Sequence, residues 1–296
     1  MDEDLPVPEQ AVLAVLYAPG QRPSLGDVRR AGEASAAFAV SHDPGDNAGW
    51  AELLITGLIF DVSGLAAGPG EALPPVAHHF GFTASQASDE AAGEGLEALL
   101  LRPGTHLAGA ASMLPVVRGC VALGSALATA TGAAAVVWIP ARTAMATAYF
   151  AGVIGDWLGG GAFPALGLTA VVPGGAGMVS EGLAFFTGQE IEVGGDNRAQ
   201  AGRIAVRMVH TLVGHGPLTA PAELTGPDGE ALRAEPSGDG STVRVTLRPG
   251  GGPIIPRCRR SHSARSIARA GPGMSPGCNA TTCCRACWSA NGVSPA

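Results

Sequence analysis

The chain has 296 residues and a formal net charge of −7, and all 18 of its Lys-or-Arg positions are arginine. The absence of lysine excludes a phosphate-binding loop that ends in Gly-Lys-Ser or Gly-Lys-Thr, and it excludes the lysine Schiff base of pyridoxal-phosphate enzymes. Together with 44 glycines and 23 prolines, this usage indicates coding DNA rich in G and C.

Short apolar runs separated by turn residues organise the first part of the chain. Ser24 is predicted to be the N-cap of a short helix that ends near residue 30, and Pro69, Pro74 and Pro75 predict a loop over residues 63–90. The leucine spacing at 96, 99 and 100 favours a helix over residues 89–101. Strands are expected over residues 11–17, 35–41, 52–62 and 105–110.

The second part shows clearer periodicity. Residues 197–213 form the best amphipathic pattern, with Ile204, Met208 and Leu212 on one stripe. Pro173-Gly174-Gly175 marks a hairpin turn between two strands. Further helices are expected over residues 113–130 and 142–158, and strands over 134–139, 166–172, 179–186, 189–193 and 242–247.

This order of elements predicts an α+β fold. Residues 134–247 match the strand–helix–strand–strand–helix–strand order of a ferredoxin-like, or split βαβ, arrangement. The first half of the chain resembles a looser copy of this arrangement, in the order of its elements alone. The body is therefore either a single unit or two such units in tandem, over residues 1–132 and 133–250.

Composition changes abruptly near residue 250. Residues 1–250 hold 25 acidic residues against 12 arginines, a net charge of −13, whereas residues 251–296 hold six arginines, five of the six cysteines and no acidic residue. One folded domain seldom changes so sharply. We therefore predict a body over residues 1–250 and a basic tail over 251–296 that is disordered or is the product of a shifted reading frame.

The body favours a soluble, cytoplasmic protein. The acidic N-terminus lacks the apolar core of a secretory signal, and Cys120 is the one cysteine of the body. Residues 119–141 are uncharged, but Gly132 and Pro140 interrupt them and Ala, Gly and Thr predominate, so we expect a buried helix and strand and no membrane partner. The acidic balance argues against nucleic acid as a partner.

Residues 130–248 carry a family resemblance. The segment 179–193 contains a G-L-x-x-F-x-x-x-E-I-E core, made of Gly182, Leu183, Phe186, Glu190, Ile191 and Glu192. With the strand and helix of residues 134–158 before it, this core resembles the bacterial family catalogued as domain of unknown function 4261. The resemblance implies a bacterial protein and no particular activity. The tail has no counterpart in that family.

Three carboxylates are the first candidate site. Glu190 and Glu192 are two residues apart on a predicted strand, so their side chains share a face about 7 Å apart, and Glu181 lies on the preceding strand. Such a set can hold a divalent cation or supply an acid and a base. The favoured alternative is a surface strand with solvated carboxylates and with Ile191 and Val193 inside.

The remaining candidates in the body favour structural roles. His78 and His79 are adjacent and diverge on regular structure, while His210 and His215 lie about 140° apart around a helix, so neither pair suits a shared metal. Cys120 lies in an apolar helix, where a thiol is usually inert. The sequence contains no G-x-S-x-G nucleophile motif, and no cofactor is expected.

Cysteines in the tail give the sharpest motif by spacing. Cys278, Cys283, Cys284 and Cys287 lie within ten residues and could ligate zinc or an iron–sulfur cluster. A shifted reading frame of a G+C-rich gene gives the same composition, and we favour that interpretation, so no metal is expected.

The preferred function is therefore a binding or interaction module with a protein or small-molecule partner. The alternative is a hydrolase or metal-dependent enzyme that uses the acidic strand around Glu181, Glu190 and Glu192.

Overall fold

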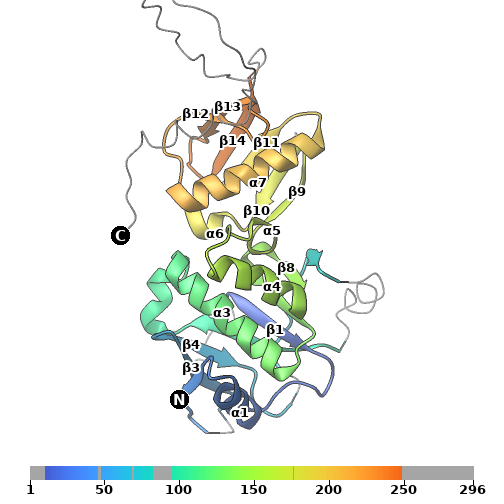
Figure 1. The fold of residues 1–296 in the computed structure, drawn as a ribbon, viewed down its shortest axis with the longest axis vertical. Helices are drawn as coiled ribbons and strands as arrows, with labels where there is room; N and C mark the ends of the chain where they lie inside the picture. Colours follow the sequence, from blue (N-terminus) through green and yellow to red (C-terminus); the bar gives the residue numbers. More distant parts are fainter. Residues whose placement is uncertain (1–10, 46–47, 69, 83–94, 176, 249–296) are drawn as a thin grey trace, which may run out of the picture. The chain divides into compact units, whose positions relative to one another are not determined.

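Two sheets with helices packed on them make up the fold (Figure 1). The computed structural model describes residues 11–45, 48–68, 70–82, 95–175 and 177–248, all within one compact unit. One sheet has eight strands in the order β2-β3-β4-β6-β1-β7-β8-β5, and the other has six in the order β12-β13-β14-β11-β10-β9. The predicted α+β class is confirmed.

The larger sheet is built around β1 (Leu13–Tyr17), which pairs antiparallel with β6 (Glu97–Pro103) and β7 (Ala135–Trp138). Every residue of β1 is buried because both faces and both edges of the strand are covered, which explains its continuous apolar run. The other strands are β2 (Ala39–His42), β3 (Trp50–Ile55), β4 (Leu58–Ser63), β5 (His78–Phe80) and β8 (Thr143–Ala146).

Three helices cover one face of this sheet: α1 (Leu25–Ser35), α3 (Leu114–Thr131) and α4 (Thr147–Leu158). Ser24 caps α1, as predicted, in a reciprocal capping box with Asp27. The helix α3 is long and apolar enough to cross a membrane, but half of that stretch is buried within the protein, as expected for a core helix. The predicted buried helix is thus confirmed.

The smaller sheet carries α7 (Arg198–His215) on one face. The stripe of Ile204, Met208 and Leu212 is buried there, as the periodicity predicts. The parallel strands β11 (Glu190–Gly194) and β14 (Thr242–Leu247) lie side by side at the centre. The remaining elements are β9 (Ala170–Gly174), β10 (Gly177–Glu181), β12 (Ala222–Thr225), β13 (Ala231–Pro236), α5 (Ala165–Leu168) and α6 (Ala184–Thr187).

Aromatic side chains join the cores of the two sheets. Phe163 packs against both cores and lies edge-on to Phe186 at a ring distance of 5.2 Å. Phe186 in turn stacks on Trp138, which is fully buried in the larger sheet. Residues from the connection after α4 and from α6 therefore extend the main core into the smaller sheet.

Several local predictions are wrong. Residues 52–62 form the β3–β4 hairpin rather than one strand. Thr56 and Gly57 are its two turn residues, and both have a positive φ, +49° and +83°, as a two-residue hairpin loop requires. The described part of 89–101 is a strand, β6, and not a helix. Residues 105–110 form a 3-10 helix (η2, Thr105–Ala110) instead of a strand.

The ferredoxin-like arrangement is not confirmed. The strand at 135–138, which would open that unit, pairs with β1 and β8 in the larger sheet. The change of sheet therefore comes after α4 and does not coincide with the division at residues 132 and 133. The hairpin at 173–175 does join two antiparallel strands, β9 and β10. The end of the strand predicted over residues 179–186 is wrong, because residues 184–186 are helical.

Candidate functional site

Glu181, at the end of β10, bridges two groups from the larger sheet. Its Oε2 accepts a hydrogen bond from Nε2 of His78 at 2.9 Å, and its Oε1 accepts one from Nε of Arg142. The Arg142 guanidinium is the main reason that the pKa of Glu181 lies below its ordinary value, and His78 acts in the same direction. Glu181 thus has two donors: His78 of β5, and Arg142, which lies directly before β8.

The backbone around this contact is tightly constrained. Arg142 is in the left-handed region, with φ of +50°, and its carbonyl accepts hydrogen bonds from the N–H groups of Ala77 and His78. Gly182 also has a positive φ, +84°, and lies directly against Ala141. The ion pairs of Glu181 therefore lie beside a close backbone contact between β10 and the larger sheet. We call His78, Arg142, Glu181 and Gly182 the sheet joint.

Glu190 has a different set of partners. Its carboxylate accepts hydrogen bonds from the hydroxyl of Ser180 and from the backbone N–H groups of Leu183 and Ala184, at 3.3 and 3.0 Å. The same Ser180 hydroxyl accepts a hydrogen bond from the N–H of Ile191 at 2.8 Å. Glu190 therefore holds the chain between β10 and β11 in place.

Glu192 lies on the outer face of the smaller sheet. Its carboxylate is 3.6 Å from the Nε of Arg244 on β14. Farther across the same sheet, Arg233 pairs with Glu235 and Glu223 at 2.6 and 3.1 Å. The predicted alternation along 189–193 is confirmed, since Ile191 and Val193 are buried while the carboxylates are not.

The three carboxylates therefore do not converge on one point: each one meets a separate group of donors. Within the ranges that the structure describes, no three His, Cys, Asp or Glu side chains are placed to hold a metal ion. The tail cysteines 278, 283, 284 and 287 lie outside the described residues.

The other candidates have apolar surroundings. His79 lies edge-on to Phe82 at 5.8 Å, so it diverges from His78 as predicted. His210 packs against Phe163, and burial lowers its pKa, with the nearby Arg207 acting in the same sense. Cys120 is fully buried, which raises the pKa of its thiol to about 12, the state expected of an unreactive core thiol.

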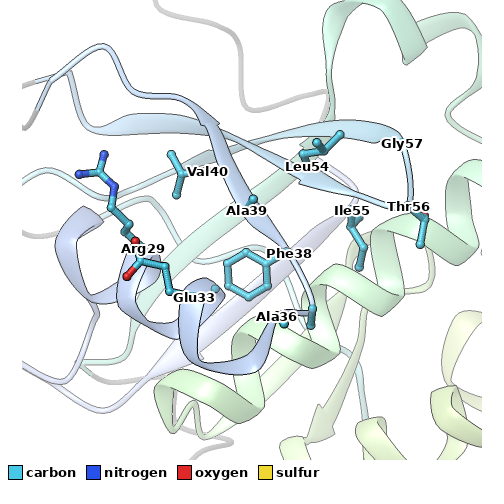
Figure 2. A pocket seen from close by; sticks show the side chains of 12 residues that line it. Arg29, Glu33, Ala36, Phe38, Ala39, Val40, Leu54, Ile55, Thr56 and Gly57 are labelled. Atoms are coloured by element: carbon cyan, nitrogen blue, oxygen red, sulfur yellow. The ribbon is translucent and has the colours of Figure 1, made fainter.

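A hollow of about 600 Å³ lies where α1 ends and β2 begins (Figure 2). Arg29 and Glu33 project from α1 on one side, Leu54 to Gly57 of the β3–β4 hairpin line the other, and Phe38 lies between them. We call this hollow the edge groove. Its lining is Arg29, Gly32, Glu33, Ala36, Ala37, Phe38, Ala39, Val40, Leu54, Ile55, Thr56 and Gly57.

The edge groove draws on both faces of the larger sheet. Phe38 and Val40 pack into the core beneath α1, whereas Ala39 pairs with Leu54 on the opposite face. The strand β2 is the last of the sheet on this side, and among the described residues only β3 pairs with it. Leu54 is 37% exposed, which is high for a leucine. The groove thus lies at the end of the sheet, beside its last strand.

No local sequence pattern indicates the edge groove or the partners of Glu181. The predicted strand 35–41 is mostly small residues, and that composition suits an exposed edge as well as a buried strand. His78 and Arg142 are 103 and 39 residues from Glu181, so only the tertiary structure brings them together.

Comparison of the chain with models of protein families, with curated proteins and with solved structures found no match.

Proposed function

We propose that this protein is an interaction module that binds an extended segment of a partner protein along β2, in the edge groove. One observation carries the proposal: the hollow lies along β2, the last strand of the larger sheet, and residues from both faces of that sheet line it. A strand added beside β2 would point alternate side chains to opposite faces. One set would meet Gly32 of α1 and Ala36, which caps the end of that helix, and the other would meet Ala39 and Leu54.

The dimensions of the edge favour a short contact. The strand β2 has four residues, and its pairing with β3 shifts register between Val40 and His42. A bulge of this kind limits uncontrolled pairing of sheet edges. The geometry therefore supports recognition of a few residues, in which backbone hydrogen bonds supply affinity and the apolar lining selects aliphatic side chains.

A displayed library of random peptides tests the proposal with the full chain as the target. We expect enrichment of sequences that alternate aliphatic with other residues, and protection of the amides of residues 38–42 from hydrogen exchange when such a peptide binds. Leu54→Lys should weaken binding about tenfold through lost apolar contact. Leu73→Lys is the matched control, because Leu73 is also 37% exposed and does not line the groove.

Failure to enrich any peptide refutes the proposal. Equal binding by the wild type and Leu54→Lys, or protection that falls outside residues 38–42, also refutes it, because the peptide would then bind elsewhere.

A second candidate, a hydrolase, rests on the contact between Glu181 and His78. A carboxylate that accepts a hydrogen bond from Nε2 leaves Nδ1 as the proton acceptor of a neutral imidazole, as in a base held by an orienting carboxylate. Of the three acidic residues Glu181, Glu190 and Glu192, this alternative gives a catalytic role to Glu181. Turnover of a panel of ester and phosphoester substrates that disappears in Glu181→Gln and in His78→Gln would establish it in place of the interaction module.

The proposal also includes membership of the family catalogued as domain of unknown function 4261 and a cytoplasmic location. The core residues from Gly182 to Glu192 support the first. The single cysteine of the body supports the second.

A further inference from the structure

The charges of the edge groove carry a deeper inference about its ligand, which rests on the proposed function. Arg29 donates a hydrogen bond to the carboxylate of Asp43, so its charge is neutralised within the chain. Glu33 lies one helical turn farther along α1, is exposed and lines the groove. Among the described residues it takes part in no ion pair. One negative charge is thus left at the groove.

The wider surface has the same sign. Residues 1–250 carry a net charge of −13, so the field of the body attracts cations and repels acidic segments. At the groove, the residues around Glu33 are small or apolar: Gly32, Ala36 and Phe38.

We infer that the partner segment is basic: it carries an arginine or lysine on the side that faces α1, placed against Glu33, between aliphatic residues. Arginine suits this position well, since its planar guanidinium pairs with a carboxylate through two hydrogen bonds and its stem can lie along apolar surface. In a strand beside β2, the basic residue would lie on the face of Phe38 and Val40, and its neighbours on the face of Leu54.

The peptide selection described above tests this inference through charge exchange. Against the wild type we expect arginine or lysine at one fixed position of the enriched sequences. Against Glu33→Arg we expect an acidic residue at that same position. For one peptide selected on the wild type, Glu33→Gln should weaken binding about two- to fivefold at low salt, and added salt should reduce the difference. Circular dichroism confirms that these exposed helix variants are folded.

Arg30→Gln is the control within α1. Arg30 is exposed, pairs with Asp27 and does not line the groove, so its replacement should not weaken the binding of a basic peptide. The outcomes separate the two proposals. If peptides bind in the groove but carry no fixed basic residue, or if Glu33→Gln binds as tightly as the wild type, the basic partner is refuted and the interaction module stands. If no peptide binds, the interaction module itself is refuted.

Discussion

Replacement of Gly182 by alanine tests the sheet joint most directly. Gly182 has a φ of +84°, and a Cβ atom added to it would lie 2.7 Å from Cα and 2.9 Å from N of Ala141. Both are backbone positions that a rotamer change cannot clear. The β10 end and the larger sheet would have to move apart, and the ion pairs of Glu181 lie one residue away.

The expected magnitude has two parts. The left-handed conformation costs a residue other than glycine about 1 kcal/mol. Forcing an extra methyl group into a packed contact costs about 1–3 kcal/mol more. We therefore expect Gly182→Ala to lower the free energy of unfolding by about 3 kcal/mol. Gly188 offers the matched control: its φ is +74° and no atom lies within 4 Å of its added Cβ, so Gly188→Ala should cost about 1 kcal/mol.

Urea titrations followed by tryptophan fluorescence measure both values, since buried Trp138 contacts Phe185 and Phe186 of the adjoining α6. The difference between the two variants isolates the contact with Ala141, because the conformational cost is common to both. Equal losses of stability in Gly182→Ala and Gly188→Ala would refute the close approach of β10 to Ala141.

Three further predictions concern single side chains. Arg142 and His78 lower the pKa of Glu181 in the folded chain, so its ion pairs stabilise the fold at neutral pH, and this stabilisation is lost as the pH falls below the ordinary value of 4.5. Glu181→Gln should therefore lower the free energy of unfolding by about 1 kcal/mol in urea titrations at neutral pH. The difference from wild type should shrink in acid, and a difference that stays constant would contradict the argument. Cys120 should resist iodoacetamide in the native chain at about pH 8 and react in urea, as peptide mapping by mass spectrometry would show; native labelling would mean that the helix α3 opens readily. Tyr17→Phe removes a 2.8 Å hydrogen bond to Oγ1 of Thr131 in a buried setting and should lower the free energy of unfolding by about 1 kcal/mol; an unchanged urea midpoint would show that the hydrogen bond adds no net stability.

Elements whose pattern is local were predictable from the sequence. The stripe of Ile204, Met208 and Leu212 defines α7 because one face of that helix meets a sheet and the other meets solvent. The alternation of Glu190, Ile191 and Glu192 likewise defines a half-buried strand. These patterns record which side of one element is covered, and that is enough to fix the α+β class.

Elements covered on all sides were less predictable. In β6, the run of residues 97–103 is buried on both faces, so its leucines show no alternation, and their spacing also fits a helix. The sequence did not indicate a turn at Thr56-Gly57, because threonine is unusual at a positive φ. The assignment of β7 to the larger sheet depends on its pairing with β1, which is more than 100 residues away.

The candidate sites show the same division. The sequence alone determined that no lysine chemistry is possible, that the body is acidic and that Glu190 and Glu192 share one face, since composition and strand periodicity are properties of the chain itself. Only the tertiary structure decided that Glu181 meets His78 and Arg142, and that α1, β2 and a hairpin turn line one hollow beside Glu33. The physical reason is that these groups lie far apart along the chain, and only the pairing of strands and the packing of helices on them bring them together.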